Sequence, residues 1–190
     1  GLHVRWAAQH PRTPQLYRAQ YGADGQDGGD GTGPGGEWEL RVGGPAASIG
    51  PRVRRWLAAH ALDIFSTANH TTAQRTIMCT ADQAAPPHGP TGRAAAPRAL
   101  AGVAMGDPRS RWGSCSSTGR IRYNWRLIMA PDFVRHAIVA HEIAHLAHMN
   151  HGPQFYALVD ALVGEDVHAR SRGWLRQHGG ALHQWRFDAD

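Results

Sequence analysis

The segment from His141 to His151, which reads HEIAHLAHMNH, constrains the fold more than any other part of the chain. His141 and His145 are separated by one helical turn, so a helix places both side chains on one face about 6 Å apart, within reach of a single metal ion. Glu142 follows the first histidine and can take a proton from a water molecule on that ion. The pattern therefore predicts a zinc site carried by a helix.

The flanking residues support this helix. Pro131 suits the first turn, where its missing N–H is no loss, and the charge of Asp132 complements the positive end of a helix. From there, apolar side chains and histidines follow one stripe at helical spacing: Val134, Ile138, His141, His145 and His148. Such a stripe faces the core, where unpaired imidazoles would be costly, so the histidines are better explained as metal ligands than as chance residues.

The sequence offers three candidates for a third ligand. His148 shares the stripe but lies about 10 Å along the axis from His141, which is too far for one straight helix. His151 is better placed if the helix ends near Met149–Asn150 and the chain turns back before a new helix at Pro153. Glu165 would be the glutamate ligand of a thermolysin-like site. We favour His151, keep Glu165 as the second choice, and expect His148 beside the metal or the substrate.

The spacing of the three histidines also occurs in metzincins, which have a glycine between the second and third histidines and a later methionine turn. This chain has His148 at the glycine position and no methionine after Met149. A metzincin is therefore not expected.

A second signature lies upstream, between Asp107 and Leu127. Ile121, Tyr123 and Trp125 alternate with polar or basic residues, which is the pattern of a strand with one apolar face. The Ser-Ser-Thr-Gly sequence before it is typical of a hairpin turn, and residues 100–105 are expected to form a further strand.

Four segments resemble one known family in their order and sequence: RWGSC (111–115), NWRLIMAP (124–131), HEIAH (141–145) and NHGPQFY (150–156). The chain is similar over residues 98–180 to the YgjP-like metal-dependent hydrolases, which are relatives of SprT-like peptidases. The resemblance implies a zincin-like peptidase with His141, His145 and His151 as zinc ligands and Glu142 as catalytic base. Phe155 and Tyr156 match a position that more often reads Phe-Trp in the family.

The 20 basic residues of the 190-residue chain are all arginines, and the net charge is +5. This charge permits weak contact with nucleic acid. Five of the arginines lie in 108–131, among Trp112, Tyr123 and Trp125, which could form a basic and aromatic patch for a single strand. A hairpin with one core face and one solvated face explains the same pattern better, so nucleic acid is possible but not favoured as a partner.

The rest of the chain suggests the domain organisation. Residues 22–36 read as a flexible Gly- and Asp-rich linker, so 1–36 is expected to be an extension, 37–180 a single domain and 181–190 a tail. Within the domain we expect a strand at 37–42, a helix from Pro51 to about Thr72, a loop over 81–98, and helices at 153–163 and 166–178. No apolar stretch is long enough to cross a membrane. The two cysteines, Cys79 and Cys115, fit a reduced, cytoplasmic setting.

These observations predict an α+β, zincin-like domain in which a small mixed β-sheet packs against the metal-binding helix. The expected function is that of a zinc metallopeptidase with one Zn²⁺ ion and a peptide or protein substrate. Candidates for substrate or transition-state contacts are Arg111, His148, Tyr156 and His168. Two alternatives stay open: a DNA-associated, SprT-like protease, or a non-catalytic adaptor stabilised by zinc. The retention of Glu142 argues against the adaptor.

Overall fold

The computed structural model describes residues 2–18, 38–82, 98–185 and 187. The chain divides into two compact units, Gly1–Trp56 with Arg186–Asp190 and Leu57–Trp185. The predicted linker at 22–36 and most of the predicted loop at 81–98 lie outside the described residues.

The first unit contains a three-stranded sheet in the order β1-β3-β2, with β1 at Leu2–Trp6, β2 at Gln15–Arg18 and β3 at Trp38–Val42. The central strand β3 pairs parallel with β1 and antiparallel with β2. Leu40 and Val42 are fully buried, as expected of alternate residues on one face of a strand. The strand predicted at 37–42 is thus present, and it pairs with segments of the N-terminal extension. A short 3-10 helix, η1 (Ala46–Ser48), follows.

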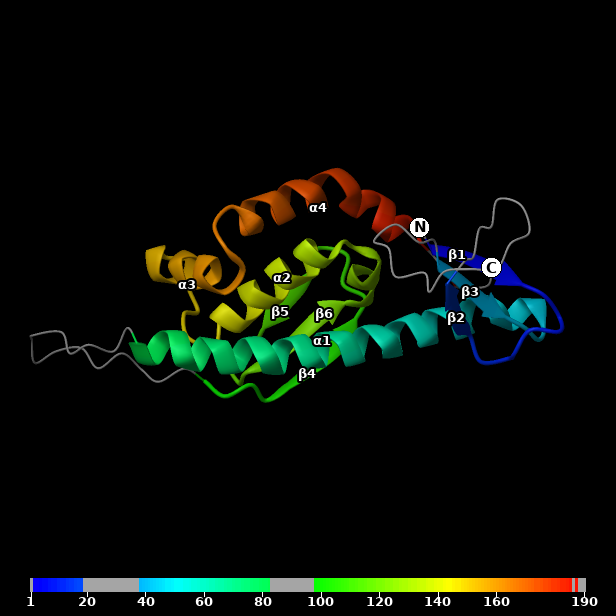
Figure 1. Ribbon diagram of the computed structural model, residues 1–190, viewed down its shortest axis with the longest axis horizontal. Helices are drawn as coiled ribbons and strands as arrows, with labels where there is room; N and C mark the ends of the chain where they lie inside the picture. Colours follow the sequence, from blue (N-terminus) through cyan, green and yellow to red (C-terminus); the bar gives the residue numbers. More distant parts are fainter. Residues whose placement is uncertain (1, 19–37, 83–97, 186, 188–190) are drawn as a thin grey trace, which may run out of the picture. The chain divides into compact units, whose positions relative to one another are not determined.

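The second unit carries the rest of the elements, shown in Figure 1. Helix α1 (Ile49–Asp82) enters it at Leu57 and is followed by β4 (Gly102–Gly106), β5 (Gly113–Cys115) and β6 (Arg120–Asn124). After η2 (Trp125–Met129) come α2 (Asp132–Ala144), α3 (Pro153–Val163) and α4 (Val167–Gln184). The sheet has the order β4-β6-β5, with β4 parallel and β5 antiparallel to the central strand, so it is mixed as predicted.

The alternation in β6 decides which face of this sheet is covered. Ile121 and Tyr123 are buried, whereas Arg120 and Arg122 are exposed on the opposite face. The Tyr123 ring packs 4.6 Å from that of Phe65 on α1, and its hydroxyl donates a hydrogen bond of 2.9 Å to the Asn69 side chain. The apolar face therefore packs on helices, and the other face is open to solvent.

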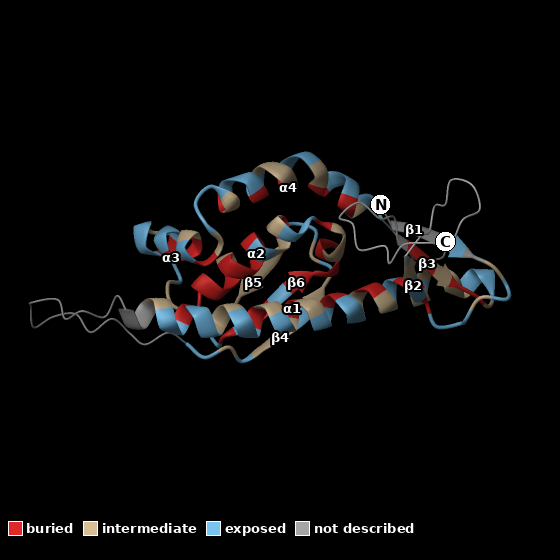
Figure 2. Cartoon of the chain, in the orientation of Figure 1, coloured by how far each residue is buried: buried red, intermediate tan, exposed pale blue. Residues whose placement is uncertain are grey.

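Helix α2 lies in the middle of this unit, with the sheet on one side and α4 on the other (Figure 1). Figure 2 shows it buried along most of its length, whereas α4 exposes one side. Most residues of α2 from Val134 onward are buried, because they contact the sheet, α3 or α4. This central position holds the HEIAH segment inside the unit.

Three helices end at other residues than predicted. Helix α4 continues to Gln184 rather than ending at 178, so residues 181–184 of the predicted tail are helical. Helix α2 ends at Ala144 rather than near Met149–Asn150, because Leu146 and Ala147 donate to carbonyls only three residues back and so tighten the chain into a turn. Helix α1 continues past Thr72 to Asp82. Its last turns are held by packing of Cys79 against the cluster around Phe155, which outweighs the low helix propensity of the local sequence.

The predicted α+β class is confirmed by these helices and sheets. The zincin-like architecture stays a prediction. No helix among the described residues is long and apolar enough to span a bilayer.

Candidate metal centre and catalytic cleft

The end of α2 and the loop that follows bring three histidines together. His141 lies in the last turn of α2, His145 is its C-cap, and His151 immediately precedes the N-cap of α3 at Gly152. Each offers a nitrogen, and these three atoms lie within 4.8 Å of one another. The Nε2 atoms of His141 and His151 are 3.2 Å apart. Two ligands of a tetrahedral metal ion with bonds of ~2.0–2.1 Å are separated by about 3.3–3.4 Å, so this pair of nitrogens is spaced to bind one ion.

The second ring nitrogens of two of these histidines are also engaged. Nδ1 of His145 lies 3.0 Å from the backbone carbonyl of His148, to which it donates when protonated. Nδ1 of His141 lies 3.2 Å from Nε2 of His168 on α4. The carbonyl can only accept, so it holds the proton of His145 on Nδ1 and leaves Nε2 for an ion, while His168 orients the ring of His141. Burial is the main cause that lowers the pKa of His141, to about 3, and that of His145, so both are neutral and able to bind a metal.

Phe155 supports all three imidazoles from α3. Its side chain is fully buried, and its ring centroid lies 4.9 Å from that of His141 and 4.7 Å from those of His145 and His151. A rigid apolar ring in contact with three ligands restricts their rotation, so Phe155 holds the triad in place before any ion binds.

Glu142 follows His141 on α2 and faces β5 of the sheet. Only 5% of its surface is exposed, and this burial raises the pKa of its carboxyl to about 7 against the opposing effect of Arg111. A Cβ atom added to Gly113 on β5 would lie 2.3 Å from Oε1 of Glu142. Only glycine lets the β5 backbone pass this close to the carboxylate. Glu142 is thus held between α2 and β5.

Two of the three histidines, His141 and His151, line one cavity of about 580 Å³ together with Glu142. The cavity lies between β5 and α4, and its walls include Gly113, Tyr156, His168, Arg172 and Arg176. The Tyr156 ring is partly exposed at its edge, 6.3 Å from the His151 ring and 5.8 Å from the His168 ring. A volume of this size is typical of a ligand site.

The structure brings some of the site residues predicted from the sequence together and separates others from them. It brings together His141, Glu142, His145, His151, Tyr156 and His168. Glu165 is exposed in the α3–α4 connection and does not belong to the histidine cluster, so the thermolysin-like choice is not supported. His148 contributes its backbone carbonyl, and its side chain does not line the cavity. Arg111 influences Glu142 electrostatically but lines a different cavity.

Arg172 and Arg176 were missed by sequence reasoning. They follow His168 on α4 at one and two helical turns, with Leu175 between them on the same face. The signal available in the sequence was this spacing, which places the side chains on one face of a helix. Only the packing of α4 shows that this face is turned toward the cavity.

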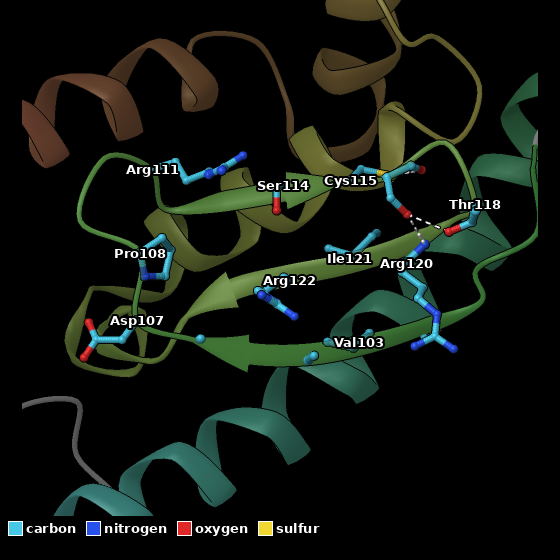
Figure 3. Close-up of a pocket in the computed structure, with 14 residues that line it drawn as sticks. Val103, Asp107, Pro108, Arg111, Ser114, Cys115, Thr118, Arg120, Ile121 and Arg122 are labelled. Carbon is cyan, nitrogen blue, oxygen red and sulfur yellow. Dashed lines mark hydrogen bonds between the residues drawn. The ribbon is translucent and has the colours of Figure 1, made fainter.

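The second cavity, of about 800 Å³, lies on the open face of the β4-β6-β5 sheet (Figure 3). Arg111, Arg120 and Arg122 line it, together with small or hydroxyl residues such as Ser114 and Thr118. Trp112, Tyr123 and Trp125, which the sequence suggested as stacking partners, are absent from its walls, and Tyr123 and Trp125 are buried. Arg111, Arg120 and Arg122 are therefore separated from these rings, as expected of a hairpin with one core face and one solvated face, whereas the buried Arg126 stacks on Trp125.

A triad of histidine nitrogens beside a buried glutamate, open to a cavity, is the kind of site that metal-dependent hydrolases use. Comparison with known families agrees, because residues 92–178 match the family described as YgjP-like, metallopeptidase domain. This match confirms the resemblance seen in the sequence. Comparisons with curated proteins and with solved structures found no match.

The contact between His141 and His168 leads to a testable expectation. Replacing His168 with alanine removes the partner of Nδ1 of His141, so the ligand is less well oriented. Loss of such a partner typically weakens metal binding about 10–100-fold. Competition with a chromophoric chelator measures the change. His168→Gln, which keeps a hydrogen-bonding group, should recover part of the affinity, and equal loss in both variants would contradict a role through this contact.

Proposed function

We propose that the protein is a zinc-dependent metallopeptidase in which Glu142 acts as the general base. The observation that carries the proposal is the convergence of the His141, His145 and His151 nitrogens within 4.8 Å, beside a buried carboxylate in an open cavity. When bound, a zinc ion would lower the pKa of a water molecule and polarise the scissile carbonyl. Glu142 then accepts the proton of the attacking water and returns it to the leaving amine.

Among the described residues β5 is an edge strand of its sheet, and its outer edge is suited to hold an extended peptide. The amide of Asn124 donates to the Trp112 carbonyl and that of Ser116 to the Arg120 carbonyl, so these are the hydrogen-bonded pairs of the antiparallel ladder. Gly113 and Cys115 alternate with them and point their N–H and C=O groups away from β6. A substrate strand added at this edge would pass next to Glu142, which lies against Gly113.

Tyr156 is the best placed of the candidates for stabilising the oxyanion. It lines the cavity with a partly exposed ring, whereas His168 is engaged with His141 and the His148 side chain lies outside the walls. Its hydroxyl can donate a hydrogen bond to the negative oxygen that forms on the carbonyl.

Gly113→Ala tests the packing of β5 on the catalytic carboxylate. The new methyl group would displace Glu142 or the strand, since the added Cβ lies far inside contact distance of Oε1. We expect peptide hydrolysis to fall at least about 100-fold, because misplacement by about 1 Å can cost that much, while the zinc content stays unchanged. Gly180→Ala on α4 is the matched control, as a Cβ there meets nothing within 4 Å. Equal activities of the two variants would contradict the arrangement.

The function itself is tested by a proteomic cleavage screen with the zinc-loaded protein. We expect new peptide termini in the presence of the wild-type protein and none after zinc is removed by a chelator. Cleavage that persists without metal, or its absence under all conditions with metal bound, would overturn the proposal.

A nucleic-acid-associated protease is the second candidate, and the arginine-lined cavity of Figure 3 favours it. Arg120 and Arg122 lie on the same face of β6, and Asp107, the acidic residue in this wall, already pairs with Arg126. With no aromatic ring in the walls, contact would be with phosphates, and binding would weaken steeply with salt. Salt-dependent binding of an oligonucleotide, lost on replacing Arg120 and Arg122, would distinguish this candidate. The third candidate, a non-catalytic adaptor stabilised by zinc, would not need a buried glutamate beside the histidines.

A further inference from the structure

The cleft carries two positive side chains that the proposed reaction does not use. Arg172 and Arg176 both line the cavity that contains His141 and Glu142, and both are exposed to solvent. Neither forms an ion pair with a carboxylate among the described residues. Two guanidinium groups that face a substrate cavity without an acidic partner are available to bind an anionic group of a substrate.

The position of these arginines follows from α4. His168, which contacts the ligand His141, begins the row, and Arg172 and Arg176 follow about 6 and 12 Å further along the helix axis. Arg172 is close enough to the centre to lower the pKa of both His141 and His168 electrostatically. The row therefore starts at the metal centre and runs along one wall of the cleft.

The opposite wall is β5. Trp112 and Gly113 line the same cavity, and Trp112 rests on α4, where its ring stacks 4.5 Å from that of His183 and would lie 2.9 Å from a Cβ at Gly179. A peptide extended along β5 therefore has α4 as its neighbour. An extended peptide rises by about 3.3 Å per residue. Side chains within about four residues of the scissile bond therefore lie along the part of α4 that carries Arg172 and Arg176.

The charge of the cleft determines which side chains fit there. Glu142 is the acidic residue among its walls, and it is buried against Gly113 rather than directed at the arginines. A bound divalent ion would make the cavity more positive still. Basic substrate side chains would meet like charges, whereas a carboxylate can accept paired hydrogen bonds from a guanidinium group.

We infer that Arg172 and Arg176 form a carboxylate-recognition subsite that makes the enzyme select substrates with an acidic group within about four residues of the scissile bond. This inference rests on the proposed peptidase function and names its substrate class. The carboxylate can belong to an Asp or Glu side chain or to the free C-terminus of the substrate, and the guanidinium chemistry is the same for both.

Binding to the Glu142→Gln variant tests the subsite without relying on hydrolysis. Zinc-loaded protein is titrated into fluorescent, amidated peptides that contain Asp or Glu at one scanned position, and into the matching Asn or Gln peptides. We expect the acidic peptides to bind about fivefold more tightly, since an exposed ion pair contributes up to ~1 kcal/mol. Peptides with a free C-terminus and no acidic side chain distinguish the two sources of the carboxylate.

Adding Arg172→Gln and Arg176→Gln should reduce this preference to a ratio near one. The matched control replaces Arg55 and Arg75, which are exposed, line neither cavity and change the net charge equally. Zinc content is measured in parallel, because the first arginine lies near His141. An unchanged preference in the double variant, the same loss in the control, or no preference in the parent protein would overturn the inference.

The result is distinguishable from failure of the proposed function. Acid-selective binding that depends on the two arginines, together with no cleavage by the wild-type protein, would support the subsite and contradict the peptidase. Cleavage of neutral and acidic peptides at equal rates would support the peptidase and contradict the subsite.

Discussion

Replacing His145 or His151 with alanine is expected to reduce the zinc content of the purified protein from about one ion per chain to a small fraction of that value. Each variant leaves two of the three converging nitrogens, and a structural or catalytic zinc site needs at least three protein ligands. Elemental analysis after dialysis against a weak chelator measures the loss.

His148→Ala is the matched control for this prediction. The residue lies between the other two in the sequence, but it acts through its backbone carbonyl, which alanine retains. Its zinc content should therefore equal that of the wild type. Loss of zinc from His148→Ala, with none from His151→Ala, would contradict the assignment of the third ligand. Circular dichroism of the metal-free proteins checks that all three variants fold.

Glu142→Gln is expected to abolish hydrolysis while zinc and the fold are retained. Glutamine is nearly isosteric with glutamate but cannot accept a proton at neutral pH. Because general acid–base catalysis contributes about 10²–10⁴-fold, kcat should fall by at least two orders of magnitude. The side chain is buried against Gly113, and the amide occupies the same space.

The comparison with Glu165→Gln makes this prediction specific, since Glu165 is exposed and lies outside the cleft. That variant should hydrolyse peptides at the wild-type rate. Wild-type turnover by Glu142→Gln would show that another group activates the water, whatever the metal content. Zinc analysis and the melting temperature of both variants separate a lost base from a lost fold.

The metal-binding segment shows how far the sequence could predict the site. Its histidine spacing is local, so any helix over this segment places His141 and His145 on one face. The turn to His151 was also predicted, although the helix ends five residues earlier than Met149. The end of the helix depends on the hydrogen bond between the His145 ring and the His148 carbonyl and on backbone hydrogen bonds to carbonyls three residues back. The helix propensities of the residues do not reveal these bonds.

The hairpin was predicted for a similar reason. Alternation of apolar and basic residues in 120–124 has a period of two, so it determined which side of β6 is buried and which carries the arginines. The sequence suggested that the strand of Arg111–Cys115 borders the cleft, but the contact of Gly113 with Glu142 joins residues far apart in the chain and is seen only in the structure.

The sequence by itself determined the chemistry of the site: the histidines that converge, the glutamate beside them, and the strand and helices of residues 100–184 that carry them. Only the tertiary structure decided that His168 would contact His141, that Phe155 would support three imidazoles, and that Arg172 and Arg176 would face the cleft. The physical reason is that periodicity fixes which residues share a face of one element. Which element that face meets depends on the packing of α4, α2 and the sheet as a whole.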